Sequence, residues 1–491
     1  MNPSSSVSES LLNGTRVALL PLARTTFDME YATQQFHSMK ESITSLRCTV
    51  LGGENLLTDD EAANKAISNL LEQKPDLVMV LQTTFTDAQV VCSLASATDL
   101  PLLIWSMPEP RNGERLRLNS FCGLNLASHA LGMNQHNFKW LFADPAAQDS
   151  TTELEKTLQS ALAPTEDTKA FDNDNKFKPV PANNLLSDDL MSAEAQQALD
   201  NLKGKRIARI GEHPPGFSTC AYDAADVHRS TGITVEEKSL SGWFEQSRNV
   251  SPEKTAEVRQ QVAKQLTNLD EVDQRQLASS LNLAVTLDEM TSAEKFDAFA
   301  LRCWPETFTE YGGAACGAAA LMGEKRVPCA CEADVLCAVT QLLLQEVSGE
   351  AVFLVDLVDF DIKDNSAVVW HCGQAPLSMC SPSVKPEATI HTNRKMPLLY
   401  QFPLRAGEIT LLRWSQSKAS QSLVIGTAEV LDRPMSCTGT SGVIRFERAA
   451  ADVLDTAIES RLEHHVALAY GDHRDKLIAV AGELDLPVLE L

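Results

Sequence analysis

Arg16-Val-Ala-Leu-Leu-Pro21 is a short apolar run bounded by polar sequence, which is the pattern of a buried β-strand. Apolar residues then recur at spacings of 4, 3, 4 and 3, which predicts an amphipathic helix through Ala32, Phe36, Met39, Ile43 and Leu46. Further strand patterns at Asp76-Leu-Val-Met-Val-Leu81 and Leu100-Pro-Leu-Leu-Ile-Trp105 are separated by helical sequence. This alternation predicts a doubly wound α/β domain over residues 1–165.

The same alternation returns after a polar interruption. Between about residues 145 and 200 the sequence is polar, so we expect a linker or a surface excursion there. A strand pattern resumes at Lys205-Arg-Ile-Ala-Arg-Ile-Gly211 and is followed by helical sequence. We therefore predict a second doubly wound α/β domain over residues 166–348.

The sequence beyond residue 348 changes to shorter apolar runs separated by turns. Ala367-Val-Val-Trp370 and Ile409-Thr-Leu-Leu-Arg413 are examples. Such spacing favours a β-rich C-terminal domain, which we place at residues 349–491. The predicted fold class is α/β, with two doubly wound α/β domains followed by this β-rich domain.

The composition argues against several classes of partner. The chain has 491 residues and a net charge of −24, whereas nucleic acids and anionic membranes are bound by basic surfaces. Residues 1–10 have no basic start and no apolar core of signal-peptide length, and no apolar run approaches about 18 residues. We expect a cytoplasmic protein whose 12 cysteines, none in a CxxC pair, are reduced and mostly buried.

Signatures of nucleotide binding and of a serine nucleophile are absent from the sequence. It contains no GxGxxG, no GxxxxGK[ST] and no GxSxG. Gly439-Thr-Ser-Gly442 is too short for a phosphate loop and predicts a turn.

Two carboxylates stand in apolar surroundings. Glu332 follows a Cys-Ala-Cys sequence and precedes an apolar helical run, and Asp356 lies inside the strand pattern Ala351-Val-Phe-Leu-Val-Asp356-Leu-Val. A buried carboxylate is costly unless it is paired or bound to a cation. Plainer interpretations remain open: Glu332 complements a helix dipole, and Asp356, on one face with Asp359 and Asp361, belongs to an exposed edge strand.

Histidines add nitrogen ligands to this acid pair. His464-His465 precedes a strand pattern, in which neighbouring side chains point to opposite faces, so only one of the two is expected at a given site. His371 ends the strand pattern after Asp356, although a single histidine is more often structural. Two carboxylates with one or two imidazoles suit Mn²⁺, Mg²⁺ or a similar ion better than a thiolate zinc site does.

Arg24 lies at the C-terminal end of the first predicted strand. Open α/β domains collect their ligand-binding groups at that end of the sheet, so Arg24 could grip a hydroxyl or an anionic group. An ordinary surface arginine is the alternative.

Short segments spread over most of the chain carry a family resemblance. They are Leu20-Pro-Leu-Ala-Arg-Thr-Thr-Phe-Asp28, Arg302-Cys-Trp-Pro-Glu306, Ala315-Cys-Gly317, Cys331-Glu-Ala-Asp334, Val355-Asp356, Trp370-His-Cys-Gly373 and His464-His465. On these segments the sequence resembles the L-fucose/L-arabinose isomerase family, metal-dependent aldose–ketose isomerases with two α/β domains and a β-rich C-terminal domain. The separation of 24 residues between Glu332 and Asp356 (356 − 332) is similar to that of the metal-binding carboxylates of fucose isomerases.

The resemblance implies a role for each matching residue. Glu332 and Asp356 would hold the metal, usually manganese with Mg²⁺ or Co²⁺ as alternatives, and would act as the acid/base pair, with His465 as the third ligand. The other implied residues are the candidate additional ligands His371 and His464 and the substrate contacts Arg24 and Trp304.

The implied activity is that of an aldose–ketose isomerase on a free sugar, by default an L-fucose-like deoxysugar or a pentose. Proton transfer between C2 and C1 through an enediolate needs carboxylates near both carbons and no redox cofactor. One alternative is an aldose with an acidic group at C6, such as sulfoquinovose. An alternative of another class is a non-catalytic cytoplasmic sugar-binding protein. The resemblance also implies a homo-oligomer, a trimer or a hexamer, in which Arg24 reaches a neighbouring subunit's site.

Overall fold

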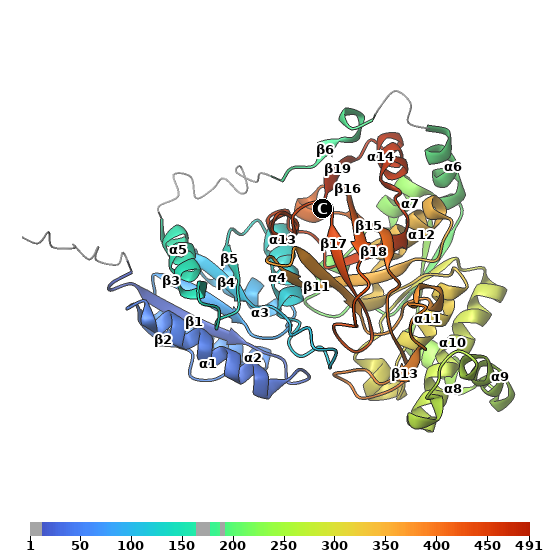
Figure 1. Cartoon of the computed structure of the whole chain (residues 1–491), viewed down its shortest axis with the longest axis horizontal. Helices are drawn as coiled ribbons and strands as arrows, with labels where there is room; N and C mark the ends of the chain where they lie inside the picture. The colour runs from blue at the N-terminus through green and yellow to red at the C-terminus, as the bar shows by residue number, and fades with distance from the viewer. Residues whose placement is uncertain (1–11, 164–176, 187–191) are drawn as a thin grey trace, which may run out of the picture. The chain divides into compact units, whose positions relative to one another are not determined.

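The computed structural model describes residues 12–163, 177–186 and 192–491. The chain divides into two compact units (Figure 1). The first unit comprises Met1–Glu109 and Arg117–Asp174, and the second comprises Pro110–Leu116 and Asn175–Leu491. The three-domain division expected from the sequence stays a prediction. Across the three described ranges, no helix combines the length and the apolar character needed to cross a membrane.

The first unit contains a parallel sheet in the order β2-β1-β3-β4-β5. Its strands are β1 (Arg16–Leu22), β2 (Thr49–Gly52), β3 (Leu77–Gln82), β4 (Leu102–Ser106) and β5 (Lys139–Phe142). β1, β3 and β4 lie at the apolar runs that predicted strands. Every residue of β3 and β4 is buried, because both faces of such a sheet are covered.

Helices follow the strands of the first unit as predicted. Those described are α1 (Met29–Ser45), α2 (Asp60–Glu72), α3 (Gln89–Ala97), α4 (Ser120–Met133) and α5 (Ser150–Leu162). The Asp28 side chain caps α1 by accepting a hydrogen bond from the backbone N–H of Tyr31. α1 contacts α5, whereas α3 contacts α2 and α4. The first unit is therefore an α/β layer structure around a parallel sheet.

The second unit begins with another parallel sheet, in the order β10-β9-β7-β8. Its strands are β7 (Arg206–Ile210), β8 (Thr234–Lys238), β9 (Ala298–Leu301) and β10 (Cys329–Ala330). The helices of this part are α6 (Ser192–Leu202), α7 (Ala224–Thr231), α8 (Leu240–Arg248), α9 (Pro252–Ala263), α10 (Gln274–Glu294) and α11 (Cys316–Glu324). The strand predicted after the polar interruption is β7, and the second α/β layer structure is confirmed.

A larger antiparallel structure follows and closes on itself. The pairings run β17-β12-β11-β18-β15-β16, and β16 pairs back with β17. The strands of this ring are β11 (Phe353–Asp361), β12 (Ser366–His371), β15 (Gly407–Ser415), β16 (Ser422–Val430), β17 (Thr440–Phe446) and β18 (His465–Tyr470). The β-rich character predicted for this part of the chain is confirmed, and the closed ring protects its strand edges.

Shorter elements extend and cover this ring. They are the strands β6 (Val180–Pro181), β13 (Glu387–Thr389), β14 (Leu399–Pro403) and β19 (Pro487–Glu490), and the helices α13 (Ala450–Glu459) and α14 (Arg474–Glu483). β13 and β14 extend the sheet beyond β17, whereas β19 and β6 extend it beyond β16.

α12 (Val335–Ser348) links the two sheets of the second unit. Its side chains are almost all buried, and it contacts β9 of the parallel sheet as well as β15 and β18 of the ring. Asp334 caps its N-terminus by accepting a hydrogen bond from the backbone N–H of Cys337. The start of α12 therefore faces the ring strands that carry the predicted site.

The polar stretch at residues 145–200 is more structured than the expected linker. α5 occupies 150–162 and buries Leu154 and Leu158, and α6 occupies 192–202. These two leucines are four residues apart, a spacing that is typical of a helix. The polar composition of the stretch favoured a linker instead, so the helix was not predicted. The rest of the predicted linker lies partly outside the described residues.

Candidate active site

Glu332 sits in a short turn between β10 and α12, with its backbone in the left-handed region. Its φ is 58° and that of Ala333 is 55°. This conformation costs a residue other than glycine about 1–2 kcal/mol, and such strain collects at functional sites. Asp334 is the residue that caps α12, and the Glu332 carboxylate contacts the side chains of Trp304 and His464 instead of the helix N–H groups.

The Glu332 carboxylate is buried and has donors on both oxygens. Oε1 accepts a hydrogen bond from Nε1 of Trp304 at 2.9 Å. Oε2 lies 3.0 Å from Nε2 of His464 and 3.7 Å from Nε2 of His465. The turn thus aims this carboxylate at the histidine pair.

Asp356 does not lie on an edge strand, because β11 is paired with β12 on one side and with β18 on the other. It is directly opposite His465 of β18, and its Oδ1 is 3.8 Å from Nε2 of His465. Asp356 is only 7% exposed, so the edge-strand interpretation is wrong. Directly opposite residues share a face, which brings the carboxylate and the imidazole to one side of the sheet.

A β-bulge keeps the predicted acidic face of β11 intact. The pairing with β12 shifts between Leu357 and Asp359, so that Asp356, Asp359 and Asp361 all stand opposite even-numbered residues of β12. Only Asp356 joins the site. Asp359 instead pairs with Arg111, whose Nε lies 2.5 Å from its Oδ2.

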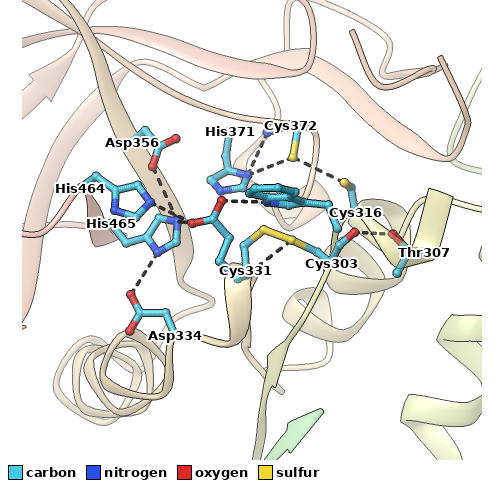
Figure 2. Close-up of a disulfide and its surroundings, with 12 residues drawn as sticks. Cys303, Thr307, Cys316, Cys331, Asp334, Asp356, His371, Cys372, His464 and His465 are labelled. Carbon is cyan, nitrogen blue, oxygen red and sulfur yellow. Dashed lines mark hydrogen bonds and ion pairs between the residues drawn. A yellow bond between two sulfur atoms is a disulfide. The ribbon is translucent and has the colours of Figure 1, made fainter. Parts of the chain in front are cut away.

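Both neighbouring histidines reach the site, contrary to the sequence expectation. Their ring centroids are 3.9 Å apart, and Figure 2 shows them side by side. β18 begins at His465, so His464 lies before the strand and escapes the alternation of side chains. His464 and His465 therefore both face Glu332.

Burial and the histidines set the charges of the site. Burial acts to raise the pKa of Glu332, but the hydrogen bond and charge of His464, with His465 and Trp304, outweigh it and hold the pKa at about 2. Burial raises the pKa of Asp356 to about 6, since neighbouring histidines compensate only part of it. Burial and the charge of His464 lower the pKa of His465. The Glu332 carboxylate is thus stabilised by its neighbours, whereas the cost of burying the Asp356 carboxylate is only partly compensated.

The arrangement can hold a divalent cation. Asp356, His464 and His465 offer ligand atoms within 4.8 Å of one another, and so do Cys220, Glu332 and His465. Asp356 Oδ1 is buried without a hydrogen-bond partner within the described part of the chain. Each group contains one carboxylate, and carboxylate and imidazole ligands suit an ion such as Mn²⁺. Cys220 fits less well, because burial raises the pKa of its thiol well above the usual value.

His371 lies beside this group rather than within it. Its ring centroid is 5.9 Å from that of His465, and its Nδ1 accepts a hydrogen bond from the backbone N–H of Cys372 at 2.9 Å. The Cys372 sulfur lies 3.5 Å from that of Cys316 (Figure 2). His371 belongs to neither candidate ligand group among the described residues.

A disulfide joins Cys303 and Cys331. Reduced cysteines were expected throughout, so this expectation is wrong for the pair, whereas the other ten cysteines are free. The two cysteines directly precede Trp304 and Glu332, respectively. The disulfide therefore links the segment that carries Trp304 to the segment that carries Glu332, two residues that are hydrogen-bonded to each other.

The two expected substrate contacts lie in different units. Trp304 follows β9 in the second unit, and its ring meets that of Phe217 edge-on at 5.3 Å. Arg24 follows β1 in the first unit, where its Nη2 lies 2.6 Å from Oδ2 of Asp87.

Comparisons with known proteins find related isomerases. A family model described as the N-terminal domain of fucose/sulfoquinovose isomerase matches residues 18–164. Proteins named sulfoquinovose isomerase from Priestia aryabhattai and Priestia megaterium are each 28% identical over 476 residues, which is 97% of this chain and 99% of theirs. A protein of the same name from Alkalicoccus urumqiensis is 27% identical over 476 residues, which is again 97% of this chain and 99% of the relative.

The chain is similar to the fucose isomerase-like family, over residues 18–164 by the family model and along nearly its whole length by these relatives. It is an isomerase, an intramolecular oxidoreductase of the aldose–ketose class. The expectation of a non-catalytic sugar-binding protein is not supported.

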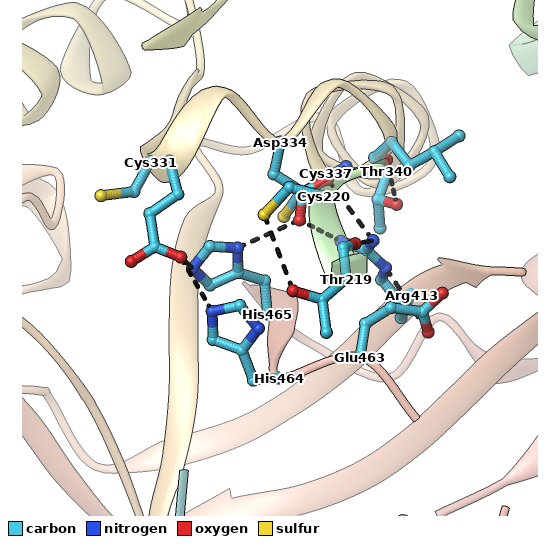
Figure 3. Close-up of polar contacts among 12 residues, drawn as sticks. Thr219, Cys220, Cys331, Asp334, Cys337, Thr340, Arg413, Glu463, His464 and His465 are labelled. Atoms are coloured by element: carbon cyan, nitrogen blue, oxygen red, sulfur yellow. Dashed lines mark hydrogen bonds and ion pairs between the residues drawn. The ribbon is translucent and has the colours of Figure 1, made fainter. Parts of the chain in front are cut away.

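Sequence reasoning missed a second layer of charged residues in this isomerase. Asp334 Oδ2 lies 3.0 Å from Nδ1 of His465 and 2.7 Å from Nη1 of Arg413 (Figure 3). Asp334 stands just before the apolar run of α12, which is a recognisable N-cap signal. The sequence does not predict that Arg413 is buried, because an arginine in a strand pattern usually faces solvent. Its burial results from the closure of the ring.

Proposed function

We propose that this isomerase converts sulfoquinovose, an aldose with a sulfonate at C6, into its ketose. A divalent cation, Mn²⁺ by preference, would be held by Glu332, Asp356 and His465. The observation that carries the choice of substrate is the similarity to sulfoquinovose isomerases along 97% of the chain. That similarity favours the C6-acidic aldose over the L-fucose-like sugar that the sequence alone made the default.

The buried acid pair supports the proposed reaction. When bound, a divalent cation would polarise the sugar carbonyl and offset the charge developing on its oxygens. One of the carboxylates Glu332 and Asp356 would remove the proton from C2 and return it to C1, while the other supports proton movement between O1 and O2. Trp304 and His464 orient Glu332 through their hydrogen bonds to its two oxygens.

A sulfonate also requires a cationic partner. The guanidinium carbon of Arg394 lies 4.8 Å from the ring centroid of Trp304, and Trp304 donates a hydrogen bond to Glu332. The indole ring of Trp304 therefore lies between Arg394 and Glu332. We assign Arg394 the sulfonate end of the sugar, while Arg24 stays an expected substrate contact.

The proposed reaction is tested with purified protein loaded with Mn²⁺ in D₂O. Sulfoquinovose, its 6-deoxy analogue without the sulfonate, and L-fucose are incubated separately and followed by NMR. We expect a ketose from sulfoquinovose, with deuterium at C1 of the ketose and C2 of the aldose, and slower conversion of the two neutral sugars. Preferential conversion of L-fucose would overturn the substrate assignment.

A matched pair of variants ties the activity to the site. Glu332→Gln keeps the shape of the side chain but removes its charge, so turnover should be lost while the fold remains. Glu310→Gln makes the same change at an exposed position of the π-helix Thr307–Tyr311 in the second unit and should leave turnover unchanged. The homo-oligomer, trimer or hexamer, and the cytoplasmic location stay predictions; sedimentation velocity tests the first.

A further inference from the structure

Asp334 has two separate tasks for its two carboxylate oxygens. Oδ1 accepts a hydrogen bond from the backbone N–H of Cys337 at 2.8 Å and so caps α12. Oδ2 lies 3.0 Å from Nδ1 of His465. The side chain is completely buried, so water does not compete for either contact.

Arg413 of β15 holds Asp334 from its other side (Figure 3). Nη1 donates to Asp334 Oδ2 at 2.7 Å, and Nη2 donates to the backbone carbonyl of Thr219 at 3.2 Å. The Arg413 side chain is 1% exposed. A buried arginine keeps its charge, so Asp334 faces a permanent cation and acts as a carboxylate acceptor.

Glu463 completes the buried charge cluster. Its Oε2 lies 3.9 Å from Nε of Arg413 and accepts a hydrogen bond from the hydroxyl of Ser415 at 2.7 Å. Its Oε1 accepts one from the backbone N–H of Gln416 at 2.8 Å. Two carboxylates around one guanidinium leave the cluster with an excess of negative charge beside His465.

The contact with Asp334 determines which nitrogen of His465 carries the proton. A carboxylate only accepts hydrogen bonds, so Nδ1 must be the donor. In a neutral imidazole the other nitrogen, Nε2, then has its lone pair free. That nitrogen lies 3.7 Å from Glu332 Oε2 and 3.8 Å from Asp356 Oδ1, distances longer than hydrogen bonds.

We propose that Asp334, held by Arg413, is a positioning residue that fixes His465 with its proton on Nδ1 and its Nε2 lone pair aimed between Glu332 and Asp356. This inference rests on the proposed function, in which His465 is a metal ligand. Carboxylates that accept from the outer nitrogen of a histidine fix its tautomer and its ring direction and strengthen it as a ligand. Asp334 itself touches neither the sugar nor the reacting atoms.

The substitution Asp334→Asn separates positioning from capping. An asparagine oxygen at the Oδ1 position still caps α12, since asparagine is as good an N-cap as aspartate. Its amide NH₂ then stands in place of Oδ2, facing Nδ1 of His465 and Nη1 of Arg413 as a donor, so the imidazole loses the acceptor that holds its proton on Nδ1. We expect a folded protein whose dissociation constant for Mn²⁺, measured by EPR, rises about 10- to 100-fold.

Asp273→Asn is the matched control. Asp273 caps α10 in the same way, with Oδ1 accepting from the backbone N–H of Gln276 at 2.8 Å. Asp273→Asn makes the same chemical change at the start of another helix of the second unit. We expect the Mn²⁺ affinity of this variant to stay within twofold of the wild type. A folded Asp334→Asn protein with wild-type Mn²⁺ affinity would overturn the positioning role.

The tautomer of His465 gives a test that needs neither a variant nor a metal. In the metal-free wild type, selectively ¹⁵N-labelled histidine should show the His465 proton on Nδ1, with the signal assigned by its loss in His465→Gln. A proton on Nε2 would overturn the inference even if Asp334→Asn did not fold. If the wild type binds no Mn²⁺, the proposed metal site fails, whereas the tautomer still tests Asp334.

Discussion

Asp356 and His465 stand directly opposite each other on β11 and β18, yet no hydrogen bond joins them. The carboxylate is buried and its Oδ1 has no hydrogen-bond partner among the residues that the structure describes. Burying a carboxylate without such a partner lowers the free energy of unfolding. The pair is therefore arranged for binding rather than for stabilising the metal-free fold.

Asp356→Asn should stabilise the metal-free protein while abolishing turnover. Burial raises the pKa of Asp356 to about 6 from an ordinary value near 4, a shift worth up to about 3 kcal/mol at neutral pH. Because the folded pKa is raised, the cost is fully present above about pH 6. It disappears as the pH falls towards the unfolded value. Urea unfolding with a chelator should show the variant more stable at pH 7.5.

The pH dependence distinguishes this effect from better packing. The difference in unfolding free energy between Asp356→Asn and wild type should shrink below pH 6 and approach zero by about pH 3, which is below the pKa of Asp356 in both the folded and the unfolded state. A difference that stays constant from pH 4 to 8 would contradict the charge-burial explanation. Carboxylates remote from Asp356 titrate equally in both proteins and cancel in the comparison.

Trp304→Phe should slow turnover without loosening the fold. The phenylalanine ring keeps the packing against Phe217, but the Nε1 donor to Glu332 is lost. A hydrogen bond to a charged group contributes about 1.5–3 kcal/mol, so we expect kcat to fall about 10-fold or more. Stopped assays with sulfoquinovose measure it. Trp243→Phe, which loses a hydrogen bond to Thr286 elsewhere in the second unit, should leave kcat unchanged.

The sequence predicts the site best where a residue's neighbours along the chain determine its surroundings. Asp356 is surrounded by apolar strand residues, and an acid in such a run is by itself a signal of burial. The prediction that Asp356 lies near Glu332 and His465 came instead from the family resemblance. Local sequence does not determine the strand register between segments that are distant along the chain.

The errors have the same physical origin. The pattern of alternating side chains excluded one histidine, because it did not show that β18 begins at His465 rather than before His464. The shared face of Asp356 and Asp359 depends on a β-bulge, although a separation of three residues would divide them in a regular strand. The partnership of Asp334 with Arg413 spans 79 residues and appears only when the ring closes.

Removing the disulfide between Cys303 and Cys331 should destabilise the second unit. A sequence separation of 28 residues corresponds to about 3.6 kcal/mol in the chain-entropy account of cross-linking. Cys303→Ser should therefore lower the unfolding free energy, measured in urea without reductant, by about that amount. Thiol titration of the unfolded, unreduced wild type provides the check, with 10 reactive thiols expected. Twelve thiols before reduction would contradict the disulfide.

Arg394→Met should change substrate preference rather than the chemical step. The guanidinium lies against Trp304, one ring away from Glu332, so it can meet the sulfonate without touching C1 or C2. Losing a charge-assisted contact of about 1.5–3 kcal/mol predicts a 10- to 100-fold lower kcat/KM for sulfoquinovose, mainly through KM. The 6-deoxy analogue, which lacks the sulfonate, should be converted as by the wild type.

The control for this variant is Arg405→Met. Arg405 also stacks on an aromatic ring, 3.6 Å from the centroid of Tyr470 at the far end of β18 from His465. It should leave kcat/KM for both sugars unchanged, because its ring contact has no connection with the acid pair. Equal losses on sulfoquinovose and on its neutral analogue in Arg394→Met would show that Arg394 supports Trp304 instead. The sulfonate contact would then have to be sought at another cation.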